Sequence, residues 1–575
     1  RHGRCRLNAA WGPEPLADGR FRFRLWAPDR QEVKLELRGG PAHSLVRDVD
    51  GWFACEAEAA PGARYRFWLD DEMVVADPAS RAQDGGVHGW SVLTEVAPPD
   101  ARDAAWKGRA WAEAVVMEVH AGVLGGFAGV AERLRDWADM GITAIELMPV
   151  AAFGGTRNWG YDGVLPYAVA ESYGTPEELT ALIDRAHELG LMVLLDVVYN
   201  HFGPDGNYLG AYASDFFDRQ ADTPWGGAVA VSREPVRRFF IDNALMWLRD
   251  YGFDGLRFDA VHAIRDSNFL DAMAREIRSS QPDRHIHLVL ENESNDAARL
   301  MTGLYDAQWN DDFHNTLHVL LTGETEGYYA GFADDPTQRL ARCLAEGFVY
   351  QGETPPGENA HPRGTPSAHL PATRFVSFLQ NHDQTGNRAM GERLIHLTGT
   401  AKLRAATALL LLCPQIPLLF MGEEEGSRSP FLFFTDFHDD LADAVREGRR
   451  REFARFSAFA DEEARRRIPD PNALETFEAS RPVPGEDAEE WRSLYGSLLA
   501  LRHERIVPRL VGTTGKGAEV LGEGAVCAEW RMGDGTELTI AINIGEEAVR
   551  FPDHGEPFFS LGQPGDPSSF AAFLA

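Results

Sequence analysis

The amino-acid sequence predicts an α/β fold, a (β/α)8 TIM barrel with an N-terminal β-sandwich domain and a C-terminal all-β domain. Short apolar runs alternate with amphipathic helical patterns between about residues 111 and 505, and polar–apolar alternation precedes and follows them. Apolar strands separated by helices are typical of a parallel sheet. Eight such units over this length are typical of a closed barrel. We therefore assign residues 1–97, 98–508 and 509–575 to the three domains.

The first domain has the pattern of half-buried strands joined by tight turns. Residues 21–26, 33–37 and 65–68 alternate polar and apolar side chains, with Asp-Gly and Pro-Gly turns between the strands. We expect an immunoglobulin-like sandwich of the carbohydrate-binding type. The proline-containing stretch 97–100 would link it to the barrel.

The barrel is predicted from eight candidate strands. They lie at residues 115–120, 142–149, 191–197, 255–259, 287–291, 305–309, 374–379 and 416–421. Helical patterns fall between most of them, for example at 176–189 and 235–251, and the first starts with Thr175, a first-turn Pro176 and two acids. The gaps 198–235 and 320–372 would be loops at the strand ends, where barrels carry function.

The last domain is predicted from a return to strand patterns at 519–521 and 537–543, after a helix that ends near residue 505. We expect a small β-domain from residue 509. It completes the arrangement of a barrel between two β-domains.

Composition excludes several classes of protein. Acidic residues outnumber basic ones by 88 to 56, for a net charge of −32, which disfavours nucleic acid as a partner. No apolar run is long enough to cross a membrane. The five cysteines are scattered without CxxC spacing, which argues against a disulfide framework and structural zinc. No leader pattern is seen, so we expect a cytoplasmic location, and we expect neither a cofactor nor a metal.

Acidic residues cluster where the predicted strands end. Asp196, Asp259, Glu291 and Asp383 would all face one barrel mouth, together with Arg257. A buried Arg257–Asp259 salt bridge is the structural alternative, but one arginine cannot offset four carboxylates. Close carboxylates push their pKa values apart, and glycoside hydrolysis needs one protonated and one ionised carboxyl group. The cluster therefore favours catalysis.

Four segments resemble the signature regions of the α-amylase family, glycoside hydrolase family 13. They are Asp196-Val-Val-Tyr-Asn-His201, Gly255-Leu-Arg-Phe-Asp259, Glu291 after an apolar strand, and Asn381-His382-Asp383. The resemblance implies that Asp259 is the nucleophile, Glu291 the general acid/base and Asp383 a ligand of substrate hydroxyls. It also implies a reaction that retains the anomeric configuration, and it implies roles for the other residues of these four segments. Arg257 would keep Asp259 ionised, His201 and His382 would bind the −1 sugar, and Asp196 and Asn200 would order the site.

Further segments, at residues 148–163, 309–314, 379–388 and 421–436, are most similar to one subgroup of this family. Its members hydrolyse the α-1,4 bond beside the terminal trehalosyl unit of maltooligosyltrehalose and release trehalose. Glycogen branching enzymes, which share the N-terminal sandwich, are the alternative. A non-catalytic carbohydrate-binding barrel is disfavoured because all three catalytic carboxylates are present. Glu425 departs from the subgroup, which often has Trp there.

The resemblance adds further expectations for the site, whose partners would be maltooligosyltrehalose and other α-glucan oligosaccharides. The remaining substrate-binding candidates are Trp159, Tyr161, Asp162, His262, Asp312 and Arg388. Aromatic candidates for stacking also include Trp225, Trp309, Tyr328 and Tyr329, with core packing favoured for Trp309. Glu293 is a second candidate for the acid, but Glu291 directly follows the strand. The +1 and +2 side would be built by His262 and residues 311–329 and 423–437.

Overall fold

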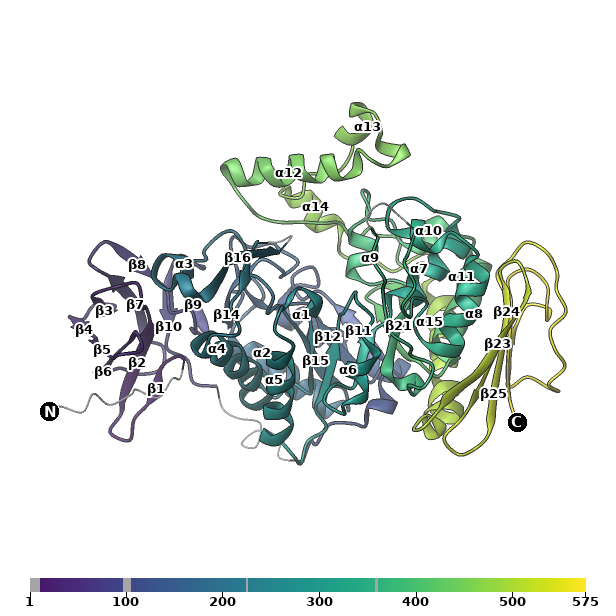
Figure 1. Cartoon of the computed structure of the whole chain (residues 1–575), viewed down its shortest axis with the longest axis horizontal. Coiled ribbons are helices and arrows are strands. Elements are labelled where there is room, and N and C mark those ends of the chain that lie inside the picture. Colours follow the sequence, from purple (N-terminus) through teal and green to yellow (C-terminus); the bar gives the residue numbers. More distant parts are fainter. Residues whose placement is uncertain (1–10, 97–104, 224–225, 357–359) are drawn as a thin grey trace.

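Three parts lie in a row in the computed structural model, which describes residues 11–96, 105–223, 226–356 and 360–575. Antiparallel sheets form one end, the barrel lies in the middle, and the C-terminal sheet forms the other end (Figure 1). The expected linker at 97–100 and the boundary after residue 97 lie outside the described residues.

The N-terminal part is a sandwich of two antiparallel sheets, as predicted. One contains β1 (Glu14–Pro15), β2 (Arg20–Trp26), β6 (Trp52–Glu58) and β5 (Val46–Arg47). The other contains β4 (Ala42–Ser44), β3 (Val33–Leu37), β7 (Arg64–Leu69), β10 (Trp90–Val92) and β9 (Ala82–Asp84), with β8 (Met73–Val75) paired to β7. The rings of Phe23 on β2 and Tyr65 on β7 meet edge to face at 5.0 Å between the sheets.

The barrel is closed by eight parallel strands, and each of the eight predicted strands is confirmed. In order they are β11 (Val116–Val119), β12 (Ala144–Leu147), β15 (Met192–Val197), β18 (Gly255–Phe258), β19 (His287–Leu290), β20 (Ala307–Trp309), β21 (Phe375–Phe378) and β22 (Ile416–Phe420). All residues of these strands are buried, as expected for strands covered on both faces. Their carboxyl ends therefore open at a single mouth.

Helices surround the strands. They are α1 (Gly126–Met140), α2 (Pro176–Glu188), α4 (Glu234–Leu245), α5 (Ser267–Ser280), α6 (Ala297–Met301), α7 (Asp311–Thr322), α8 (Pro336–Glu346), α9 (His382–Gly386), α10 (Leu394–Leu397), α11 (Thr400–Leu412) and α15 (Ala488–Leu501). The predicted cap of α2 is present as a reciprocal capping box between Thr175 and Glu178. The predicted helix at 235–251 is α4 followed by a π-helical turn, Met246–Tyr251.

Both expected loops contain regular structure, so the prediction of plain loops was wrong. Residues 198–235 include α3 (Leu209–Tyr212) and a hairpin of β16 (Phe217–Thr223) and β17 (Gly226–Val229). Residues 320–372 include α8, which Asp335 and Pro336 start and whose buried face covers the C-terminal sheet. A further hairpin, β13 (Ala151–Phe153) and β14 (Gly163–Val169), follows β12.

The C-terminal part is the predicted all-β element. It is an antiparallel sheet in the order β23 (Thr514–Gly522), β24 (Ala525–Arg531), β25 (Glu537–Asn543), β27 (Ser569–Leu574) and β26 (Phe559–Leu561). An insertion after β22 carries α12 (Asp439–Phe453), α13 (Glu462–Arg466) and α14 (Leu474–Ala479), which project above the barrel (Figure 1). Within the described ranges, no helix is both long and apolar enough to span a bilayer.

Candidate active site

A buried guanidinium, that of Arg257 on β18, lies at the centre of the acidic cluster. Its Nη1 donates to both carboxylate oxygens of Asp196 at 2.9 Å and to Oδ1 of Asp259 at 2.8 Å. Its Nη2 lies 3.0 Å from Oε2 of Glu291, and its Cζ lies 4.1 Å from the centroid of the Trp309 ring. One fully buried cation therefore bridges the ends of β15, β18 and β19.

The two bridged carboxyl groups at the mouth have further donors. Asn200 Nδ2 donates to Asp259 Oδ2 at 2.9 Å, and the backbone N–H of Ala260 donates to Glu291 Oε2 at 2.8 Å. Both side chains keep some access to solvent, 13% for Asp259 and 17% for Glu291. Hydrogen-bond donors therefore fix the position of each carboxyl group, and each group still has access to solvent at the mouth of the barrel.

Glu291 and Asp383 differ in their preferred protonation state. Burial, together with the charges of Asp259, Asp383 and Asp311, raises the pKa of Glu291 well above its usual value despite Arg257. Burial acts to raise the pKa of Asp383, but the charges of His382 and Arg257 and the hydrogen bonds from His382 and Asn387 together hold that pKa below its usual value. The site therefore combines a proton donor with an anionic carboxylate.

The His382 side chain is enclosed by aromatic rings. Tyr161 stacks on it at 5.0 Å, and Trp159 meets it edge to face at 5.5 Å. Tyr161 donates its hydroxyl to Asp196 Oδ2 at 2.5 Å, and burial raises the pKa of Asp196 to about 7. Trp159 is itself buried and donates Nε1 to the carbonyl of Leu432, so this tryptophan packs behind the histidine.

His201, Asp162 and His262 line the loops around the mouth. The Nε2 of His201 lies 2.9 Å from the carbonyl of Tyr161, and Asp162 Oδ2 accepts a hydrogen bond from Asn158 at 2.6 Å. His262 follows β18 and keeps 24% of its side chain exposed.

The second candidate for the acid lies outside the cluster. Glu293 is 73% exposed and lies 3.5 Å from His262 Nε2. The contacts of the two glutamates favour Glu291, because it alone of the pair meets Arg257.

Asp312 corrects an expectation, because its side chain has no exposure. Its Oδ2 accepts hydrogen bonds from Asn295 at 3.0 Å and from the backbone N–H of Val349 at 2.8 Å, and its Oδ1 lies 3.1 Å from Arg363. Asp312 therefore holds the segment after α8 and is not free to bind substrate. The preceding residue, Asp311, is partly exposed, and burial raises its pKa to about 7.

Arg388 also has partners other than those expected. Its guanidinium binds Glu324 through two nitrogens, at 2.6 and 2.9 Å, and Glu392 at 3.1 Å. Tyr329 stacks on His318 at 3.9 Å and is buried, whereas Tyr328 is 55% exposed. These residues build the rim after β20 and β21. Trp225 lies outside the described residues.

The first residues of the segment after β22 point away from the mouth, although residues 423–437 were expected to build the +1 and +2 side. Glu423, Glu424 and Glu425 are all buried. They accept hydrogen bonds from Tyr495, Trp137 and Arg492 respectively, all on the outer helices α15 and α1. Glu425, where the subgroup often has Trp, therefore contacts the outer helix α15 and does not face the mouth.

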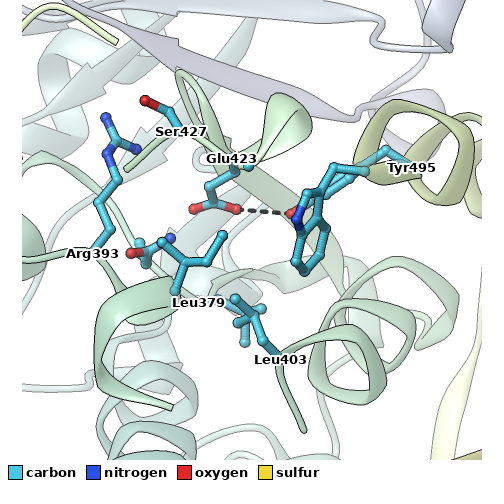
Figure 2. Close-up of a pocket in the computed structure, with 10 residues that line it drawn as sticks. Leu379, Arg393, Leu403, Glu423, Ser427 and Tyr495 are labelled. Atoms are coloured by element: carbon cyan, nitrogen blue, oxygen red, sulfur yellow. Dashed lines mark hydrogen bonds between the residues drawn. The ribbon is translucent and has the colours of Figure 1, made fainter. Parts of the chain in front are cut away.

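A small cavity lies behind this segment. Figure 2 shows Glu423 in it, between Arg393 and Tyr495. Its volume of about 20 Å³ has room for one water molecule. An oligosaccharide does not fit in this cavity.

Sequence reasoning missed one acid near the site, Glu118, and did not single out Asp311 within the expected segment 311–329. The carboxylate of Glu118 on β11 accepts the backbone N–H of His382 at 2.9 Å and pairs with His382 Nδ1. The signal for Glu118 was available, because it is an acid inside an apolar strand. No sequence signal separates Asp311 from Asp312.

Comparisons with known proteins show which family the chain resembles. The family model "Alpha amylase, catalytic domain" matches residues 100–224, and "Domain of unknown function (DUF3459)" matches residues 513–571. A malto-oligosyltrehalose trehalohydrolase from Deinococcus radiodurans is 41% identical over 560 residues, 93% of this chain and 91% of the relative. A crystal structure from Salmonella typhimurium, provisionally described as an alpha amylase, is 44% identical with a TM-score of 0.92, covering 98% of this chain and 99% of that one.

The branching-enzyme alternative has a narrower match. A 1,4-alpha-glucan branching enzyme from Bordetella pertussis is 35% identical over 277 residues, only 42% of this chain and 37% of that enzyme. The trehalohydrolase relative, by contrast, covers 93% of this chain. The chain therefore belongs to the malto-oligosyltrehalose trehalohydrolase family, among the glycoside hydrolases of the α-amylase type.

Proposed function

We propose that the chain hydrolyses the α-1,4-glucosidic bond beside the terminal trehalosyl unit of maltooligosyltrehalose and releases trehalose. The observation that carries the chemistry is the single guanidinium of Arg257 between Asp259 and Glu291. It holds two carboxyl groups beside one cation at the mouth, and retaining glycoside hydrolysis requires such a pair.

In the first step, Glu291 donates its proton to the glycosidic oxygen and the trehalose unit leaves. Asp259 attacks the anomeric carbon as the bond to that oxygen breaks, giving a covalent glycosyl–enzyme ester. Arg257 donates a hydrogen bond from Nη1 to the attacking carboxylate and so fixes its position. The burial that raises the pKa of Glu291 keeps its proton available for this step.

In the second step, Glu291, now a carboxylate, removes a proton from water. The resulting nucleophile attacks the anomeric carbon, the ester bond to Asp259 breaks, and Glu291 regains its proton. Two inversions leave the configuration unchanged. In our proposal Asp383 binds hydroxyl groups of the −1 sugar, supported by its anionic character and its place beside His382.

The choice of substrate is supported by the relatives. The full-length relative is named a trehalohydrolase, whereas the branching enzyme matches less than half of this chain. A site whose buried polar groups pair with one hydroxyl pattern rejects analogues that lack it. We expect His262 and Asp311 to contribute such groups, because both lie at the mouth with partial exposure.

The test is incubation of the protein with maltooligosyltrehalose, maltoheptaose and amylose, with products resolved by chromatography. We expect free trehalose from the first substrate and much slower cleavage of maltoheptaose. New α-1,6 branches on amylose with little free disaccharide would establish the branching-enzyme alternative instead. Equal rates on maltoheptaose and maltooligosyltrehalose would refute the specificity but leave the hydrolytic chemistry standing.

A further inference from the structure

We propose that Glu118 is a positioning residue for the proposed hydrolysis: it fixes His382 as an imidazolium, and this cation orients Asp383 for the −1 sugar. The predicted effect on catalysis rests on the proposed function. Its structural basis, a carboxylate on the first barrel strand that binds a residue 264 positions later, is independent of the substrate.

Glu118 binds His382 at two points. Its Oε2 accepts the backbone N–H of His382 at 2.9 Å, and its Oε1 pairs with the ring nitrogen Nδ1. Both side chains are 1% exposed. A single carboxylate therefore fixes the main chain and the ring together, at the start of the segment that carries Asp383.

The ring cannot turn away from this carboxylate. Tyr161 stacks on it at 5.0 Å with 23° between the planes, Trp159 meets its edge at 5.5 Å, and Trp309 lies 6.0 Å away. Its other nitrogen, Nε2, lies 3.4 Å from Asp383 Oδ1. A histidine with an acid at each nitrogen donates from both only as an imidazolium.

The surroundings of His382 make Glu118 its decisive partner. The titratable and charged groups that face the ring are Glu118 on β11, His120 after β11, Glu146 on β12, Tyr161 before β14, Asp196 on β15 and Asp383 itself. Arg257 contacts the Trp309 ring that packs near His382. Burial lowers the pKa of His120 to about 4, so this neighbour is neutral at neutral pH.

Two opposing effects act on the imidazole. Burial acts to lower the pKa of His382, and the charge of Glu118, followed by that of Asp383, raises it well above its usual value. Without Glu118, burial would dominate and the ring would lose its proton as pH rises. Asp383 would then lose the cation that keeps its own pKa low.

Glu118→Gln tests the inference, since it keeps an acceptor for the backbone N–H and removes the charge. The measurement is kcat/KM for maltooligosyltrehalose between about pH 5 and pH 8. We expect activity close to that of the wild type at the acid end and a loss of about tenfold to a hundredfold at the alkaline end, the scale of a charged hydrogen bond. Glu118→Asp, which retains the charge, should restore the wild-type pH dependence.

Glu146→Gln is the matched control. Glu146 lies beside Glu118 in strand register and is similarly buried, but no hydrogen bond joins it to His382, and burial raises its pKa well above its usual value. This variant should introduce no new alkaline limb. A loss in Glu118→Gln by the same factor at every pH would overturn the proposal, because it would show a structural effect only.

Nitrogen-15 NMR of histidine-labelled wild-type protein supplies a test that needs neither activity nor a folded Glu118 variant. The signals of His382, identified by their absence in His382→Gln, should show both nitrogens protonated throughout the neutral range. A neutral ring at pH 7 would overturn the proposal. A wild-type protein that cleaves no α-glucan but keeps a charged His382 would refute the proposed function and leave the placement of Glu118 intact.

Discussion

Replacing Glu291 by Gln tests the central assignment of the site. The amide keeps an oxygen for the Ala260 N–H, 2.8 Å away, and for Arg257, 3.0 Å away, so the fold should survive. What is lost is the proton donor. General acid catalysis contributes about 10²–10⁴ in rate, and kcat for maltooligosyltrehalose should fall by that factor.

Glu293→Gln is the matched control. Glu293 is two residues away, carries the same carboxyl group and is 73% exposed, so its change should alter the rate by no more than about threefold. A dead Glu293→Gln beside an active Glu291→Gln would show that the acid has been assigned to the wrong residue.

The leaving group separates the acid from the nucleophile. Fluoride needs no proton to depart, so α-maltosyl fluoride should form the glycosyl–enzyme with Glu291→Gln at close to the wild-type rate. Asp259→Asn should be inactive on both substrates because it cannot form the ester. The assay is stopped-flow release of fluoride, and equal impairment of both variants would refute the division of roles.

Three further predictions follow from the contacts in the site. The product released with Asp259 as nucleophile should keep the α configuration, and proton NMR showing initial β-product would instead indicate inversion. Arg257→Met leaves the buried Asp196 and the partly exposed Asp259 without their cation and should cost about 3–5 kcal/mol of stability. Since protonation removes the unpaired charges, the fall in melting temperature should be larger near pH 8 than near pH 5, and an equal fall would count against this account. Asp311→Asn removes a charge that raises the pKa of Glu291, so the alkaline limb of kcat should move to lower pH, whereas Asp312→Asn should lower the melting temperature and leave that limb in place.

The polar strand ends were readable from sequence because parallel strands have a fixed direction. Asp196, Arg257, Asp259, Glu291 and Asp383 each end or follow an apolar run, and chain order alone assigns them to one mouth. In the structure Asp196, Asp259 and Glu291 contact Arg257. Asp383 lies close enough to Glu291 for its charge to raise the pKa of that residue.

The loops were less predictable because their side chains depend on partners far along the chain. Asp311 and Asp312 are adjacent in the first turn of α7, where one residue turns the side chain by about 100°. Only the position of the segment after α8 decides that Asp312 is covered and Asp311 faces the mouth. In the same way, contacts with α1 and α15 decide that residues 423–425 pack outward.

The sequence by itself determined the order of the strands, the closed barrel between two β-parts and the identity of the acids at its mouth. These follow from local periodicity and chain direction. The protonation states and the partner of His382 were decided only by the tertiary structure. A pKa depends on burial and on charges within a few ångströms, and Glu118 reaches His382 only when the barrel closes its first strand against its last.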